Sequence, residues 1–277
     1  MKFPNKEFGE PLDLPPFKGR INPEFQRPDF VRKISRFDRI FQESPHQILF
    51  DGRNRISVIP FLLSEGKTIN VAVKEFFTRG LNRMKTLLLP SKAQKAWLGS
   101  LALMERNIPT PIPVAYLEKN RSPFIDDSCY FSVLEEDVEE IRHLFRRLSS
   151  EELSSLVQSL ACYLSLCHNK GILHRDLSDG NILVRREGQE KQTFFLIDTN
   201  RIRLKKRLGL LKRIKNLTRL GVPEAFQKLF LQKYTGSKKV KKRVWFWYRF
   251  AKKSYTWHID LKKRLHLSRE TKTRNSV

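Results

Sequence analysis

The sequence of 277 residues has few cysteines, no long apolar run and few acidic residues near its end. Its three cysteines, Cys129, Cys162 and Cys167, are too few for a disulfide framework and lack the spacing of a zinc site. No run approaches the roughly 18 apolar residues of a membrane-spanning helix. The first residues, MKFPNKEFGE, lack the apolar core of a secretory signal, so we expect a cytoplasmic protein in a reducing compartment.

The shortage of acidic residues is confined to one part of the chain. Residues 201–277 contain 25 Lys and Arg but only three acids, a net charge of +22, whereas residues 1–200 carry +3. The charge of +25 on the whole chain therefore comes almost entirely from this C-terminal block. Such a block indicates a polyanionic partner, which could be nucleic acid, an acidic membrane surface or a phosphorylated substrate.

Apolar residues make up 40% of the chain, which is enough for a hydrophobic core. Short β-branched and aromatic runs predict strands in the first half, and helical patterns dominate the second. The clearest helix is 149–170, where Ser149 and Glu152 form a capping-box pattern. We therefore expect an α+β fold with two unequal lobes. The expected segments are a Pro-rich N-terminal arm (1–45), a β-rich N-lobe (46–136), a small helical C-lobe (137–235) and a basic aromatic tail (236–277).

The most informative stretch is GILHRDLSDGNILV (171–184), followed by TFFLIDTN (193–200). Phosphoryl transfer from ATP needs a carboxylate that orients or deprotonates the attacking hydroxyl, and oxygen ligands that hold Mg²⁺ against the phosphates. Asp176 suits the first role, and Asn181 and Asp198 suit the second. No His/Cys cluster in the sequence competes for a softer metal. The residues therefore predict a kinase that uses ATP and Mg²⁺.

These motifs resemble those of protein-kinase-like enzymes. HRDLSDGN matches the H-R-D-x-x-x-x-N catalytic loop without a gap, IDTN (197–200) stands where D-F-G would be, and VAVK (71–74) matches the V-A-I-K strand. The resemblance implies a bilobal protein-kinase-like fold in which Lys74 contacts the ATP phosphates. It also implies that His174 and Arg175 support the catalytic loop.

Departures from the protein kinases indicate a narrower family. Ser178 stands where Ser/Thr protein kinases carry lysine, and no A-P-E follows Asp198. The pattern SKAQKAW…NIPTPIPVAYLE…HRDLS…NIL…IDTNR is similar to the bacterial lipopolysaccharide core kinases, the Kdo/heptose kinase family. This resemblance implies ATP-dependent phosphorylation of a sugar hydroxyl of the lipopolysaccharide inner core. The position of Asn200, Arg201 and Arg203 after Asp198 makes them candidate contacts to substrate or phosphate.

Two features usual in such kinases are weak or missing. Relatives carry a Glu that pairs with the lysine, in the helix after the VAVK strand, but Ala96 occupies that site here. We therefore expect Lys74 to pair with Asp198 alone. The phosphate-covering loop DGRNRIS (51–57) contains a single glycine, Gly52, which we expect to approach the nucleotide. These departures leave open a non-catalytic kinase-like binding protein as the alternative.

The basic C-terminal block has two sections. Residues 201–220 predict a helix that packs an apolar face on the C-lobe and turns a basic face to the acceptor site. Residues 238–264 interleave Lys and Arg with Trp and Tyr, which is typical of an anchor on an anionic membrane. Packing on the C-lobe, or stacking on RNA bases, would use the same composition.

We expect the partner of the basic block to be an anionic glycolipid, a lipopolysaccharide core intermediate, at the inner face of the cytoplasmic membrane. A second alternative is a RIO-like atypical protein kinase that acts on ribonucleoprotein, which a basic tail would also permit.

Overall fold

The computed structural model describes residues 8–36, 47–52, 54–62, 66, 68–78, 84–121, 124–188 and 191–274. The chain divides into two compact units. Unit 1 comprises residues 1–138 and 195–204, and unit 2 comprises residues 139–194 and 205–277. The segment that contains Asp198 therefore belongs to unit 1, although it follows the catalytic loop of unit 2 in the sequence.

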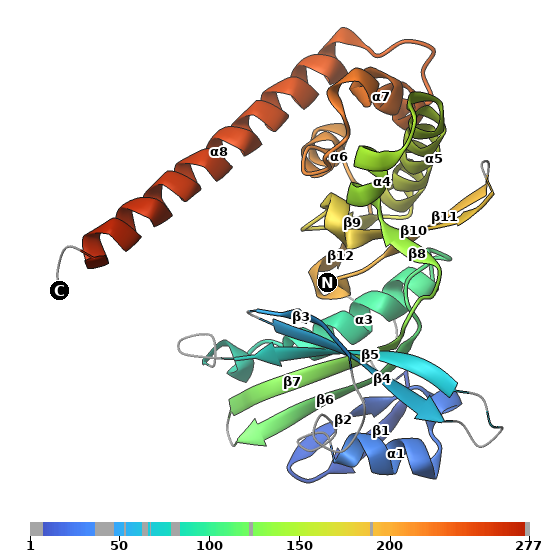
Figure 1. Cartoon of the computed structure of the whole chain (residues 1–277), viewed down its shortest axis with the longest axis vertical. Helices are drawn as coiled ribbons and strands as arrows, with labels where there is room; N and C mark the ends of the chain where they lie inside the picture. The colour runs from blue at the N-terminus through green and yellow to red at the C-terminus, as the bar shows by residue number, and fades with distance from the viewer. Residues whose placement is uncertain are drawn as a thin grey trace. The chain divides into compact units, whose positions relative to one another are not determined.

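Unit 1 is built on a seven-stranded antiparallel sheet in the order β1-β2-β6-β7-β5-β4-β3 (Figure 1). Its strands are β1 (Glu10–Leu14), β2 (Phe17–Ile21), β3 (Gln47–Asp51), β4 (Asn54–Leu62), β5 (Thr68–Phe77), β6 (Pro113–Arg121) and β7 (Phe124–Val133). Its other elements are η1 (Pro23–Phe25), α1 (Pro28–Ser35), η3 (Met84–Leu87), α3 (Lys92–Met104), η5 (Thr199–Arg201) and β12 (Ile202–Leu204).

The Pro-rich N-terminal segment, which we expected to be an extended arm, contributes to this sheet. Strands β1 and β2 form a hairpin, and β2 pairs with β6. Leu12, Phe17 and Ile21 of the hairpin and Phe30 and Ile34 of α1 are buried in the core. Each strand of the hairpin has only five residues, so its alternation is too short to stand out among the prolines.

The two faces of the sheet carry separate cores, and Figure 1 shows α1 and α3 on opposite faces. On β5, Val71 and Val73 pack with the residues of α1, whereas Phe76 packs with Trp97 of α3. Successive side chains of a strand point to opposite faces, so Lys74 shares the α3 face with Phe76.

Unit 2 is mainly helical. Its helices are α4 (Ile141–Arg147), α5 (Ser150–Asn169), α6 (Leu210–Leu217), α7 (Gln227–Thr235) and α8 (Lys242–Arg274), with the short η4 (Asp179–Asn181) and η6 (Glu224–Phe226). Its strands are β8 (Val138–Glu140), β9 (Ile172–His174), β10 (Ile182–Glu187) and β11 (Lys191–Leu196). A three-stranded sheet has the order β11-β10-β8, and the chain passes from one unit to the other within β8 and within β11.

Helix α5 confirms the clearest helix prediction. The Oγ of Ser149 accepts a hydrogen bond from the backbone N–H of Glu152, and the Glu152 carboxylate accepts one from the backbone N–H of Ser149. This is the predicted capping box, which satisfies two N–H groups at the start of the helix. The apolar face of α5 is buried, and α7 packs against the helix.

The helix expected over 201–220 is shorter than predicted. Residues 202–204 form strand β12, and α6 begins only after Gly209. Helix α8, by contrast, continues for 33 residues, with Val244 and Tyr248 buried near its start. Within the part of the chain that the structure describes, no helix has both the length and the apolarity needed to cross a membrane.

Candidate active site

In unit 1, Lys74 and Asp198 form an ion pair. The Nζ of Lys74 lies 2.5 Å from Oδ1 of Asp198, and both side chains are mostly buried. Lys74 comes from the middle of β5, and Asp198 follows β11 with a left-handed backbone conformation (φ 55°). That conformation is uncommon for residues other than glycine and often occurs at functional sites. The lysine thus has the partner that we expected in the absence of a helix glutamate.

Helix α3 contacts the segment after Asp198 through its backbone. The Oγ1 of Thr199 donates a hydrogen bond to the carbonyl oxygen of Ala96 over 2.8 Å. A Cβ atom on Gly99 would lie only 2.1 Å from the carbonyl oxygen of Thr199. Thr199 is therefore held against the backbone of α3 at Ala96 and Gly99. Glu105, at the end of α3, pairs with the neighbouring Arg106.

Buried hydroxyl groups hold the same segment in place. The Oγ of Ser100 lies 2.8 Å from Oη of Tyr130 and 3.0 Å from Oγ1 of Thr199. Burial raises the pKa of the Tyr130 phenol, which therefore stays neutral and able to donate. Sequence reasoning did not find these residues. The signal for them is the Gly99-Ser100 step, which interrupts the otherwise apolar run AWLGSLALM (96–104).

The residues that follow Asp198 differ in their surroundings. Asn200 is buried, and its Oδ1 has no hydrogen-bond partner among the residues that the structure describes. A buried acceptor of this kind needs a partner, which a ligand can supply. The Nε of Arg201 lies 4.0 Å from Oδ2 of Asp198, whereas Arg203 donates to the backbone carbonyl of Ile202. Asn200 and Arg201 thus fit a ligand at Asp198 better than Arg203 does.

Gly52 lies in the turn between β3 and β4. Its backbone N–H donates to the carbonyl oxygen of Asn54 over 3.3 Å, and a Cβ atom at this position would approach the ring of Phe50. The turn contains a single glycine, and residue 53 lies outside the described residues. Gly52 remains a predicted nucleotide contact.

In unit 2, the catalytic loop between β9 and β10 is held by its own hydrogen bonds. The backbone N–H of Asp176 donates to Nδ1 of His174 over 3.2 Å. The Nδ2 of Asn181 donates to the backbone carbonyl of Asp176 over 2.7 Å. This orientation leaves Oδ1 of Asn181 available as a ligand, and Mg²⁺ prefers oxygen ligands. His174 is buried and supports the loop, whereas Arg175 is exposed.

A buried polar network holds the end of α6 against this loop. The Nε2 of His168 lies 3.0 Å from Oδ1 of Asn216, and Nδ2 of Asn216 donates to the carbonyl oxygen of His174 over 2.8 Å. The Nδ1 of His168 lies 2.6 Å from Oη of Tyr234. Burial lowers the pKa of His168 to about 4, so its ring is neutral at pH 7. A neutral ring can donate from one nitrogen and accept at the other, as the network requires.

This arrangement brings Arg219 to the candidate catalytic carboxylate. Its Nη1 lies 2.6 Å from Oδ1 of Asp176, and its guanidinium carbon lies 5.5 Å from the centre of the Tyr255 ring. Close packing continues at Gly221, where a Cβ atom would lie 2.6 Å from a carboxylate oxygen of Asp179. Sequence reasoning did not single out Arg219. Its one signal was its position in the basic segment 201–220.

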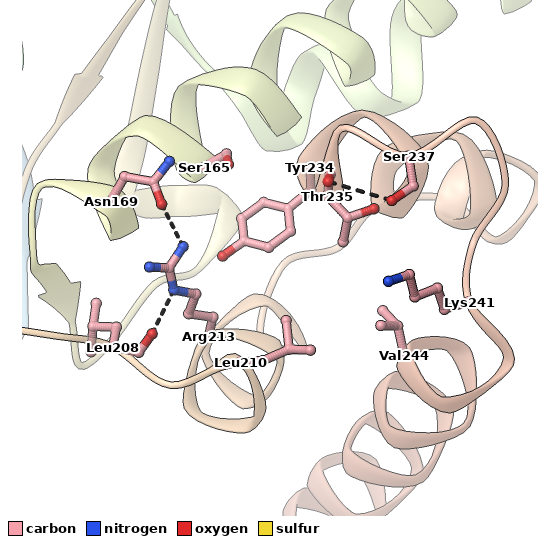
Figure 2. A pocket seen from close by; sticks show the side chains of 10 residues that line it. All are labelled: Ser165, Asn169, Leu208, Leu210, Arg213, Tyr234, Thr235, Ser237, Lys241 and Val244. Carbon is pink, nitrogen blue, oxygen red and sulfur yellow. Dashed lines mark hydrogen bonds between the residues drawn. The ribbon is translucent and has the colours of Figure 1, made fainter.

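A separate pocket of about 450 Å³ lies in unit 2, and Figure 2 shows the side chains that line it. Arg213 lies in this pocket and donates to Oδ1 of Asn169 over 2.6 Å and to the carbonyl oxygen of Leu208 over 2.7 Å. The described residues that line the pocket include none of the predicted site residues. We therefore assign the pocket no part in the chemistry.

Comparison with known proteins gives three findings. Residues 93–233 match the family described as "Lipopolysaccharide kinase (Kdo/WaaP) family". A solved structure titled "WaaP in complex with acyl carrier protein" is similar over 77% of this chain and 90% of that chain, with a TM-score of 0.54 and 18% sequence identity. This likeness shows the fold, and the predicted α+β kinase-like architecture is confirmed.

Two proteins of Mus musculus, sperm motility kinase 1 and sperm motility kinase 2B, are each 38% identical to this chain, over 53 and 52 residues respectively. The matched segment is 19% of this chain, and the chain spans only 11% of the length of these curated relatives.

Proposed function

The chain belongs to the lipopolysaccharide kinase (Kdo/WaaP) family, a family of phosphotransferases, and we propose that it transfers the γ-phosphate of ATP to a sugar hydroxyl of the lipopolysaccharide inner core, on Kdo or heptose. The family match agrees with the family resemblance of the sequence motifs. The observation that carries the proposal is the catalytic loop, where hydrogen bonds fix Asp176 and leave Oδ1 of Asn181 available.

The chemistry of the predicted residues fits a nucleotide and a divalent metal ion. In the proposed mechanism, Lys74 would hold the ATP phosphates, the backbone of Gly52 would approach them, and Asp198 and Asn181 would each offer an oxygen ligand to Mg²⁺. Carboxylate and amide oxygens are the donors that Mg²⁺ takes, and the buried Oδ1 of Asn200 offers a further oxygen. Bound Mg²⁺ would neutralise charge on the β- and γ-phosphates.

Asp176 acts on the acceptor. Its Oδ1 is held by Arg219, which leaves Oδ2 to accept the proton of the sugar hydroxyl. The hydroxyl oxygen then forms a bond to the γ-phosphorus. The bond between the γ-phosphorus and the bridging oxygen breaks, and ADP leaves with the electron pair.

The proposed place of action is the inner face of the cytoplasmic membrane. Helix α8 exposes large apolar side chains, including Phe246 and Leu261, among Lys and Arg residues. Residues 262–277 add six basic residues and one acidic residue, a net charge of +5. A helix with this composition binds an anionic membrane surface through both its apolar and its basic side chains.

The proposal is tested by incubating the full chain with γ-labelled ATP, Mg²⁺ and a total bacterial glycolipid extract, and then identifying the labelled species. We expect label on an inner-core sugar, and we expect Asp176→Ala to abolish transfer while ATP binding persists. Mg²⁺-dependent ATP binding without any transfer by the wild-type chain would instead identify a non-catalytic binding protein. Co-purifying RNA together with labelled ribonucleoprotein would identify the RIO-like alternative.

A further inference from the structure

Helices α6 and α8 of unit 2 pack against each other and border an open groove of about 670 Å³. Four aromatic side chains from α8 line it, Trp247, Phe250, Tyr255 and Trp257, together with smaller apolar side chains of both helices. Two cations, Lys215 and Arg219, come from α6 and the residues after it. A concave surface that combines aromatic rings with a few polar groups is typical of a ligand site.

The groove reaches the catalytic loop through Arg219. The guanidinium of Arg219 lines the groove, stacks on Tyr255, and donates to Oδ1 of Asp176 over 2.6 Å. The network of His168 and Asn216 holds the end of α6 against the loop. A ligand bound at Arg219 therefore lies beside the carboxylate that we place at the acceptor hydroxyl.

We propose that this groove binds the sugar–phosphate part of the acceptor glycolipid. The inference rests on the proposed function and adds the location and the chemical class of the acceptor. Lys215 and Arg219 provide positive charge, and the described residues that line the groove include no acid. An anionic group such as a phosphate or a sugar carboxylate complements this charge, and Arg can bind it through two parallel hydrogen bonds.

The aromatic side chains indicate that sugar rings accompany the anionic group. Trp247, Tyr255 and Trp257 present flat apolar surfaces that the C–H groups of a pyranose ring can cover. A bilayer surface would meet the protruding side chains of α8, whereas Arg219 of the groove is paired with Asp176. Because Lys215 and Arg219 lie in the groove, we assign it to the anionic sugar–phosphate head of the acceptor, and contact with acyl chains or a bilayer is the alternative outcome of the test.

The test uses the full chain and deacylated lipopolysaccharide core oligosaccharide, which keeps sugars and phosphates but cannot form a bilayer. We expect Trp257→Ala and Lys215→Gln each to raise the KM for this acceptor about tenfold, the cost of truncating one well-placed contact. The Kd for ATP, measured by calorimetry, stays unchanged. Leu166→Ala is the matched control, because Leu166 is similarly exposed on α5 of the same unit but does not line the groove.

The inference is overturned if the groove variants keep the wild-type KM for the deacylated acceptor. It is also overturned if their KM rises only for acceptor embedded in phosphatidylglycerol vesicles, which would make the groove a bilayer contact. Tryptophan fluorescence titration with the deacylated oligosaccharide separates this inference from the proposed function. The wild-type chain could show saturable quenching but transfer no phosphate, while Lys215→Gln weakens the quenching. That combination supports the groove and rejects the kinase activity. Absence of any binding rejects the groove.

Discussion

Arg219 and Asp176 form an ion pair in which Nη1 lies 2.6 Å from Oδ1, although 43 residues separate them in the sequence. Both side chains are partly exposed, and exposed pairs contribute little to folding stability. The effect of this pair is therefore on orientation. It fixes one carboxylate oxygen of Asp176 and leaves the other for the acceptor hydroxyl.

Replacing Arg219 tests this relationship. We expect Arg219→Gln to lower kcat by about 100-fold, as removal of one preorganised polar group from an active site does, while the Kd for ATP stays unchanged. Arg219→Lys should restore part of the activity because it keeps the charge. The matched control is Arg186→Gln, which removes another partly exposed ion pair of unit 2, the one with Glu152 at 2.8 Å. Equal loss of activity in both variants would contradict a specific role for Arg219.

Removal of Asp198 should uncouple nucleotide binding from magnesium. Asp198→Ala deletes the carboxylate that pairs with Lys74, so we expect ATP affinity to become the same with Mg²⁺ and with EDTA. Isothermal calorimetry measures both affinities. Asp29→Ala, which removes an exposed carboxylate paired with Arg32, should keep the wild-type response. A magnesium response that survives in Asp198→Ala would show that the metal has other ligands.

Gly99 should not tolerate even a methyl group. In Gly99→Ala the new Cβ would lie 2.1 Å from the carbonyl oxygen of Thr199, so α3 or the segment after Asp198 must move. We expect a loss of about 1–3 kcal/mol in the free energy of unfolding, the usual effect of overpacking, measured by urea denaturation. Gly209→Ala is the control, because its Cβ would meet no atom within 4 Å. Equal stability of the two variants would contradict the close contact.

His168 should make stability depend on pH. Its pKa in the folded chain is about 4, below the ordinary value of 6.5, because the ring is buried. Between these two values the unfolded chain binds a proton that the folded chain does not. Stability therefore decreases as pH falls from about 6.5 to about 4, by up to about 3 kcal/mol from this group. Urea denaturation of the wild type and of His168→Gln at pH 7, 6 and 5 measures it. The same pH dependence in both proteins would show that the ring is not the cause.

Truncation should show that the start of α8 stabilises the fold and that its end contributes to membrane binding. A chain that ends at residue 261 keeps the buried Val244 and Tyr248 but loses a net charge of +5. We expect an unchanged melting temperature and weaker partitioning to phosphatidylglycerol vesicles. A chain that ends at residue 236 loses both buried side chains and should melt at a lower temperature. Equal partitioning of the 261-residue chain and the full chain would reject the membrane contact of the terminal segment.

Features that depend only on residues close together in the sequence could be predicted from the sequence. The capping box of Ser149 and Glu152 is an example, because both partners lie within one helical turn. The strands of the main sheet between 46 and 136 and the HRDLSDGN loop were also found, because each has a local pattern of residues. The short hairpin of residues 10–21 was missed because its prolines and its five-residue strands hide the alternation.

Contacts between distant segments could not be predicted in this way. Arg219 is one of many basic residues in its segment, and nothing in the local pattern separates it from Lys215 or Arg213. Its meeting with Asp176 depends on the buried network of His168 and Asn216, which joins three parts of the chain. Such a network follows from tertiary packing, which a single sequence does not display.

The contact between α3 and Thr199 has a mechanical consequence. Thr199 donates to the carbonyl oxygen of Ala96, and Gly99 admits the backbone of Thr199 at close range. A displacement of α3 would therefore carry the neighbouring Asp198 with it and strain its ion pair with Lys74. Helix α3, although Ala96 offers no carboxylate to Lys74, thus still sets the position of the partner of that lysine.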